Sequence, residues 1–178
     1  MALRARTFLA ALPSDVQRLA VQPFEDANRY DWHYVPRRRQ GVAIRDLDPA
    51  QRAAADALLQ AALSEVGYRK VVGIMALEPV LREIATFGFS RDPENYAFTL
   101  FGEPGRMPWG WRLEGHHLAL NFTIVTDDLI AITPAFFGAN PARVPSGPRA
   151  GERTLAGEQD LARDLVRSFD ARLRGLAV

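Results

Sequence analysis

The segment Trp109–Phe122 constrains the fold of this chain more than any other stretch of the sequence. It holds two of the three histidines, two of the three tryptophans and a glutamate, just before a run of alternating apolar residues. Alternation with a period of two is typical of a half-buried β-strand. We therefore expect one strand from about Trp111 to Val125, with a polar cluster near its beginning.

The composition is that of an ordinary globular chain. The 178 residues include 22 Lys and Arg, 21 Asp and Glu and no cysteine, for a net charge of +1. This length suits a single domain over residues 1–178 with a full core. The lack of cysteine excludes disulfides, zinc–thiolate sites and thiol nucleophiles. A charge so close to zero gives no strong field to attract nucleic acid, and no nucleic-acid partner is expected.

No apolar stretch is long enough to span a membrane. The apolar run Thr7–Leu12 is broken by Pro13-Ser14-Asp15, which is too early for a secretory signal peptide and better explained by the entrance to a helix. We expect a cytoplasmic protein without a membrane partner.

The first half of the chain shows helix signals. Asp48 is the expected N-cap of the clearest helix, because Pro49 follows it at the first helical position and a helical apolar pattern continues to Gly67 as a left-handed cap. The other expected helices run from Ser14 to about Pro23, from Tyr68 to Ala76 and from Pro79 to Phe87.

The period then changes. Strands are expected over residues 96–101, 111–125 and 129–133, joined by short connections. A last helix carries Leu161, Leu165, Phe169 and Leu173 one turn apart, which predicts a buried face. Helices followed by strands and a helix indicate an α+β fold. We expect an antiparallel meander of about three or more strands, packed against N-terminal and C-terminal helices.

On a continuous strand, Arg112, Glu114 and His116 would share one face while His117 would point to the other. Glu114 and His116 would lie about 7 Å apart between Cα atoms, close enough to share an ion or for the carboxylate to orient the imidazole. Arg112 could hold an acidic group of a substrate. A bulge at Gly115 could redirect one of the histidines.

These positions define the candidate site. Glu114, His116 and His117 are the candidate catalytic residues, and Glu114 and His116 are also the candidate ligands of a divalent transition metal such as Zn, Fe or Cu. The candidate substrate-binding residues are Arg112, Trp109, Trp111 and Asn121.

Other interpretations of these residues stay open. A mononuclear metal site needs a third protein ligand, and the spacing does not choose among His33, Glu103, Asp127 and Asp128. Both histidines could instead be structural, and the tryptophans could belong to the core rather than to a pocket. The run Arg37-Arg38-Arg39 is a solvated loop by default, because no second basic patch accompanies it.

Several motifs resemble one known family. The central motifs are Trp109–Phe122 with Thr133-Pro134 and Phe137-Gly138-Ala139-Asn140-Pro141. Further motifs are Trp32, Tyr34, Pro36, Arg39, Gly41, Gln51, Leu58-Leu59, Leu63-Ser64, Gly67-Tyr68, Tyr96, Phe101-Gly102, Pro104 and Gly151-Glu152-Arg153. With them, nearly the whole chain resembles the uncharacterised family of domain of unknown function 3500.

The resemblance implies a split metal site, because family members carry a second, more C-terminal histidine motif of the His-x-His kind. This chain has no histidine beyond His117, so the comparison implies an incomplete ligand set: a truncated, inactive or partner-completed member. Two hypotheses follow. The protein is a metal-dependent enzyme acting on a small molecule or peptide, or it is a non-catalytic binding or assembly module, able to form a homo-oligomer, that keeps the family fold.

Overall fold

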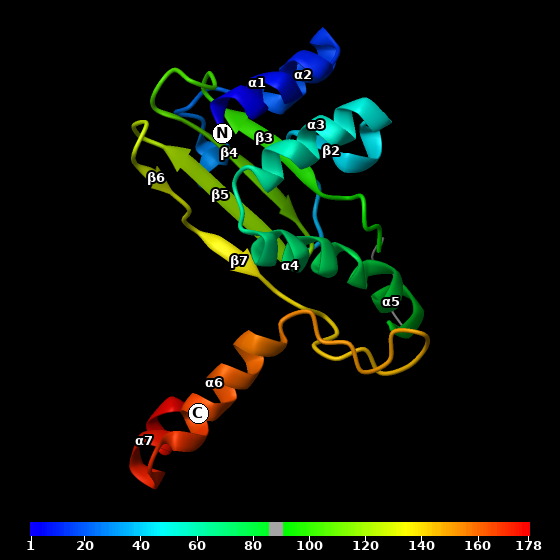
Figure 1. Ribbon diagram of the computed structural model, residues 1–178, viewed down its shortest axis with the longest axis vertical. Coiled ribbons are helices and arrows are strands. Elements are labelled where there is room, and N and C mark those ends of the chain that lie inside the picture. Colours follow the sequence, from blue (N-terminus) through cyan, green and yellow to red (C-terminus); the bar gives the residue numbers. More distant parts are fainter. Residues whose placement is uncertain (86–90) are drawn as a thin grey trace.

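A seven-stranded, mostly antiparallel sheet forms the centre of the molecule in the computed structural model, which describes residues 1–85 and 91–178 (Figure 1). The strands are β1 (Val21–Gln22), β2 (Val42–Ala43), β3 (Ala97–Phe101), β4 (Trp109–Gly115), β5 (Leu118–Ile124), β6 (Ile130–Ala131) and β7 (Ala135–Phe137). Strands β3, β4, β5 and β6 lie side by side in antiparallel order, and β1 joins β3 in parallel. The predicted α+β class and antiparallel meander are confirmed.

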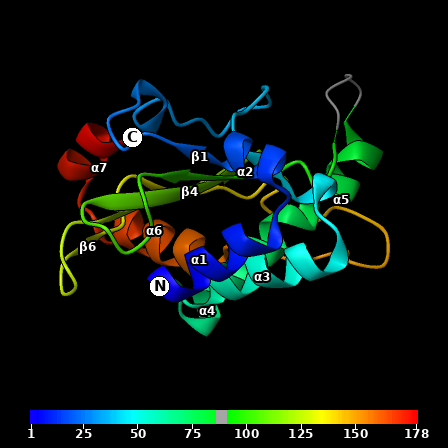
Figure 2. The ribbon, with the colours of Figure 1, turned by 90° about the horizontal axis from the view of Figure 1, so that it is seen from above.

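The helices are α1 (Ala2–Ala11), α2 (Ser14–Ala20), α3 (Pro49–Gln60), α4 (Glu65–Met75), α5 (Leu77–Ile84), α6 (Ala156–Ser168) and α7 (Ala171–Ala177). Figure 2 shows α1, α3 and α4 on one side of the sheet and the segment of residues 23–41, which contains a single 3₁₀ turn at Ala27–Arg29, on the other. The sheet therefore has one helix-covered face and one face covered by irregular chain.

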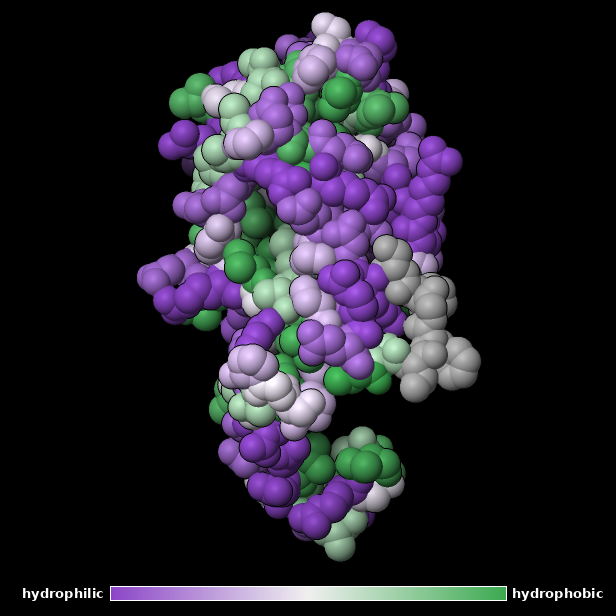
Figure 3. All heavy atoms as spheres, turned by 90° about the vertical axis from the view of Figure 1, so that its right-hand side faces the viewer, coloured by the Kyte–Doolittle hydropathy of each residue, from purple (hydrophilic) through white to green (hydrophobic). Residues whose placement is uncertain are grey.

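The C-terminal helices project away from this body (Figure 1). Leu161 and Leu165 of α6 are 73% and 59% exposed, and Leu176 of α7 is 76% exposed. The predicted buried face is therefore wrong. The two helices are separate because the chain is extended at Phe169, and hydrophobic side chains gather on the projecting part in Figure 3. No helix in the described residues is long and apolar enough to cross a bilayer.

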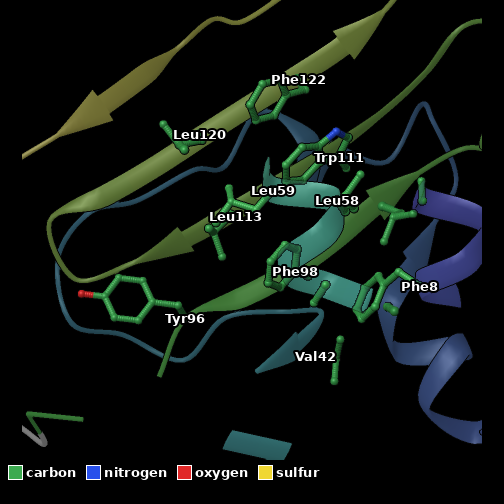
Figure 4. Packing of buried hydrophobic residues seen from close by; sticks show 14 of the residues in the cluster. Phe8, Val42, Leu58, Leu59, Tyr96, Phe98, Trp111, Leu113, Leu120 and Phe122 are labelled. Carbon is green, nitrogen blue, oxygen red and sulfur yellow. The ribbon is translucent and has the colours of Figure 1, made fainter. Parts of the chain in front are cut away.

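The core lies between the sheet and the helices α1 and α3 (Figure 4). The rings of Trp111 and Phe122 stack with centroids 4.3 Å apart across β4 and β5, and Phe98 reaches Phe8 of α1 at 5.5 Å. Leu58 of α3 is fully buried in the same cluster. Burial of such side chains contributes about 1.5–3 kcal/mol each, so this layer supplies most of the apolar stabilisation.

The helix signals in the sequence were partly correct. Asp48 caps α3 and forms a capping box with Gln51, as the Asp-Pro start predicts. The predicted end at Gly67 is wrong, because α3 ends at Gln60 and Ser64 starts α4 by accepting a hydrogen bond from the Gly67 backbone N–H. The N-cap at Ser64 thus divides into α3 and α4 what the apolar pattern predicts as one helix. The expected helix to Phe87 matches α5 as far as Ile84, and residues 86–90 lie outside the described residues.

Candidate functional site

The predicted continuous strand is wrong, because the chain reverses at His116 and His117. Gly115 pairs with Leu118, which leaves the two histidines as the loop of a tight hairpin between β4 and β5. His117 has φ 58°, the left-handed conformation that glycine or asparagine ordinarily takes in such loops. The His117 N–H donates to the Tyr34 carbonyl at 2.7 Å, and the His117 carbonyl accepts from the Gly138 N–H at 2.8 Å. Neighbouring chain on both sides therefore holds this conformation.

The reversal changes which side chains share a face. Arg112 pairs directly with Asn121 and Glu114 with Ala119, so these four lie on the face covered by residues 23–41. The apolar residues of β5, from Leu118 onward, join Trp111 on the helix-covered face instead. A continuous strand would place Leu118, Leu120 and Phe122 on the face of Arg112 and Glu114, whereas the reversal puts them on the opposite face.

Glu114 lies in a closed ionic network. Its carboxylate lies 3.0 Å from an Nη of Arg112 and 3.9 Å from Nε of Arg39, and it accepts a hydrogen bond of 2.9 Å from the His33 backbone N–H. The side chains of Arg112, Glu114 and Arg39 are only 0%, 1% and 4% exposed. The network joins β4 to residues 23–41, which we call the covering segment. Its charges compensate one another in a buried place.

Arg112 also holds the covering segment through Asn28. One Nη donates to the Asn28 backbone carbonyl at 2.8 Å and the other to its side-chain oxygen at 3.1 Å. Burial lowers the pKa of Arg112, while the neighbouring Glu114 opposes that shift. The structure thus places Arg112 behind the covering segment, in contact with protein groups.

The residues present do not fit the metal site expected from Glu114 and His116. Both carboxylate oxygens of Glu114 are engaged by arginines and a backbone N–H, whereas His116 contacts a different carboxylate. Within residues 1–85 and 91–178, no three His, Asp or Glu side chains are grouped to hold an ion. We therefore derive no chemical step through a metal.

The carboxylate partner of His116 is Glu78, on the first turn of α5. Its Oε1 contacts Nδ1 of the imidazole, and both side chains are largely buried, 5% exposed for Glu78 and 12% for His116. The Tyr96 hydroxyl donates to the His116 carbonyl at 2.8 Å. The helix thus orients the ring, and the tyrosine holds the backbone of the turn.

Arg91 lies over the His116 ring. Its Nη1 is 3.3 Å from both ring nitrogens. An atom equally far from Nδ1 and Nε2 is away from the lone-pair axis of either nitrogen. The guanidinium therefore faces the ring without lying where an in-plane partner of Nε2 would lie.

His117 completes this cluster. The rings of His116 and His117 have centroids 4.2 Å apart, so the expectation that they point apart is wrong: they share a loop rather than a strand. Nδ1 of His117 is buried and has no hydrogen-bond partner among the described residues. Burial, and next the adjacent His116, lower the pKa of His117, which favours the neutral imidazole at pH 7.

The other predicted site residues are placed elsewhere. Trp109 and Trp111 are each 1% exposed on the helix-covered face. Asn121 donates to the Pro134 carbonyl at 2.7 Å and, with Trp32, lines a small cavity of about 140 Å³. Among the candidate third ligands, the His33 ring pairs with Asp31, and the other three are exposed, namely Glu103, Asp127 and Asp128.

Sequence reasoning missed Glu78 and Tyr96. Glu78 precedes His116 by 38 residues, and no spacing rule joins them. A signal existed nonetheless: Glu78 is three residues before Leu81, on the buried face of a short helix, where a lone carboxylate needs a partner. Tyr96 packs against Gly115 so closely that a Cβ there would lie 2.0 Å from its ring, a contact that no sequence pattern indicates.

Comparisons with known proteins give a family and no activity. The family model described as "Protein of unknown function (DUF3500)" matches residues 1–178, the whole chain. No curated protein and no solved structure matches.

Proposed function

We propose that the chain, which belongs to the DUF3500 family of proteins of unknown function, is a general acid–base catalyst acting on a small molecule or peptide, with His116 as the base. The contact between the buried Glu78 carboxylate and Nδ1 of His116 carries this proposal. A cytoplasmic location belongs to the same proposal.

The chemistry follows from the orientation of the ring. With Nδ1–H donating to Glu78, the proton of the neutral imidazole is on Nδ1 and the lone pair is on Nε2. Nε2 can then accept a proton from a water molecule or a substrate hydroxyl and return it to a leaving group. Glu78 would stabilise the imidazolium that forms between these two steps.

His117 and Arg91 support this role from either side. A neutral His117 next to His116 adds a second imidazole without a second positive charge at pH 7. The Arg91 guanidinium, with Nη1 3.3 Å from both ring nitrogens, adds a positive charge beside the His116 ring.

Hydrolysis of p-nitrophenyl acetate tests the proposal, because this activated ester reports reactive imidazoles without knowledge of the natural substrate. We expect the wild-type protein to exceed His116→Gln and Glu78→Gln by about 10²-fold. The matched control is His33→Gln, which removes the histidine whose side chain pairs with Asp31. Equal rates in all four folded proteins would refute the proposal.

The exposed leucines of α6 and α7 favour a second candidate, an assembly module without catalysis. Leu161, Leu165 and Leu176 are more than half exposed on helices that project from the body. Sedimentation of the wild type and of Leu161→Gln/Leu165→Gln tests this function. Concentration-dependent association that is lost in the variant supports it, and a monomer in both cases rejects it.

A further inference from the structure

A cavity of about 1020 Å³ lies between α2, the covering segment and the residues that follow β2. Five arginines line it, and we call it the arginine cavity: Arg18, Arg37, Arg38, Arg39 and Arg45. Only two acidic side chains, Asp31 and Asp46, line it within the described residues. The wall is therefore strongly positive in a protein whose net charge is only +1.

Three of the five arginines, Arg37, Arg38 and Arg39, come from one stretch of chain. The buried Arg39 guanidinium donates to the carbonyls of Arg37, at 3.0 Å, and of Val35, at 2.7 Å, which curls the loop around it. Gly41, at φ +90°, then lies so close to β3 that a Cβ would be 2.3 Å from the Phe98 carbonyl oxygen. Arg39 is thus a positioning residue, and the arginines around it face the cavity.

Two of the cavity arginines are available to a ligand. Arg37 pairs with Asp31 at 2.6 Å, and Arg45 pairs with Asp92 at 3.2 Å. The side chains of Arg18 and Arg38 are exposed and make no ion pair or hydrogen bond with residues 1–85 or 91–178. Two unneutralised guanidinium groups at one cavity attract anionic groups and can bind carboxylate or phosphate in a bidentate way.

Asn28 adds a neutral donor to the same wall. Its residue is 8% exposed, and its side-chain oxygen is fixed by the hydrogen bond from Arg112. The amide nitrogen is buried and has no acceptor within the described residues. Nε of Arg37 and Nε of Arg39 are likewise buried without a hydrogen-bond acceptor there. Three residues of the cavity lining thus carry N–H groups that lack an acceptor, and a ligand rich in oxygen acceptors would complement them.

We propose that the arginine cavity binds a small anion carrying two or more carboxylate or phosphate groups. The volume, about 1020 Å³, suits a small-molecule ligand. The five arginines come from three short segments, α2, residues 37–39 and Arg45, and enclose one cavity, which favours a compact polyanion over the backbone of a nucleic acid, which needs a long basic track. This site shares no residue with the Glu78–His116 pair, so it stands or falls independently of the proposed catalysis.

Calorimetric titration with citrate and with pyrophosphate, at fixed ionic strength, tests the site. We expect both anions to bind the wild type, and Arg18→Gln/Arg38→Gln to weaken the dissociation constant by about tenfold or more, equivalent to ~1.4 kcal/mol. The matched control is Arg4→Gln/Arg172→Gln, which makes the same change in net charge at exposed arginines outside the cavity wall.

Three results would overturn the proposal. They are an absence of binding to the wild type, an equal loss of affinity in the cavity and control variants, and preferential binding of a single-stranded oligonucleotide that the cavity variant weakens. The first two would leave no site at the cavity, and the third would assign it to nucleic acid. A thermal melt of each variant without ligand confirms that the proteins compared are folded.

Discussion

Glu78, on the first turn of α5, contacts Nδ1 of His116, in the hairpin loop between β4 and β5. The contact joins a helix to a strand turn across 38 residues of sequence. It replaces the pairing of His116 with Glu114 that a continuous strand would have produced. Each prediction below tests a part of the arrangement around this contact.

The left-handed backbone of His117 predicts an unusual response to mutation. For a residue with a Cβ, this conformation costs about 1–2 kcal/mol, and glycine avoids that cost. We expect His117→Gly to be as stable as the wild type or up to about 1 kcal/mol more stable, and His117→Val to be less stable. Urea denaturation of the three proteins measures this. A large loss of stability in the glycine variant would show that the ring, not the backbone, dominates at this position.

The lowered pKa of His117 predicts a specific pH dependence. The unfolded group titrates near 6.5, and burial, followed by the adjacent His116, lowers the pKa in the folded state. Between these two values the unfolded chain binds more protons, so this contribution to stability is complete above about pH 6.5 and is lost as the pH falls through that window. We expect the wild type to lose more stability than His117→Asn between pH 7 and pH 5, the interval in which an unperturbed histidine titrates. Parallel pH curves for the two proteins would contradict the lowered pKa.

The buried network predicts a large loss of stability when the negative charge of Glu114 is removed. Glu114→Gln removes the negative charge that faces Arg112 and Arg39, leaving buried guanidinium groups without compensation. Breaking a buried pair in this way costs about 3–5 kcal/mol. Glu103→Gln, at an exposed position, is the control and should change the free energy of unfolding by less than about 0.5 kcal/mol. If both variants unfold at the same urea concentration, the network does not hold the covering segment.

The contact between Gly115 and Tyr96 predicts that a side chain at position 115 lowers the stability of the fold. The Cβ of Gly115→Ala would lie 2.0 Å from the Tyr96 ring, and displacing that ring would break the hydrogen bond to the His116 carbonyl. We expect a loss of about 1–3 kcal/mol, the usual range for overpacking. Gly157→Ala in α6, where no atom lies within 4 Å, should lose nothing. A Gly115→Ala protein as stable as the wild type would show that the turn can rearrange.

The fold was predictable where local signals are strong. The Asp48-Pro49 start and the aromatic and strand-favouring residues of Tyr96–Phe101 identify α3 and β3 without tertiary information. The hairpin was not, because its loop is His-His rather than the Asn-Gly or Asp-Gly pair that marks such turns. The exposure of α6 was not predictable either. Its leucines have the spacing of a buried face, and spacing does not say what covers that face.

The site was predictable only in part. The concentration of unusual residues in Trp109–Phe122 correctly drew attention to β4 and its turn. The partners of those residues come from distant segments: Glu78 for His116, and Asn28 with Arg39 for the Arg112–Glu114 pair. Such partners depend on how α5 and the covering segment pack, and one sequence does not encode that packing as a local pattern.

Imidazole nitrogen NMR of the protein at about pH 8, where an ordinary histidine is neutral, measures the central claim most directly. If Glu78 orients His116 for proton transfer, the ring of His116 carries its proton on Nδ1 in the wild type, and this tautomer loses population in Glu78→Ala while the His33 signals stay unchanged. A His116 ring protonated on Nε2, or one whose tautomer does not respond to the loss of Glu78, would contradict it.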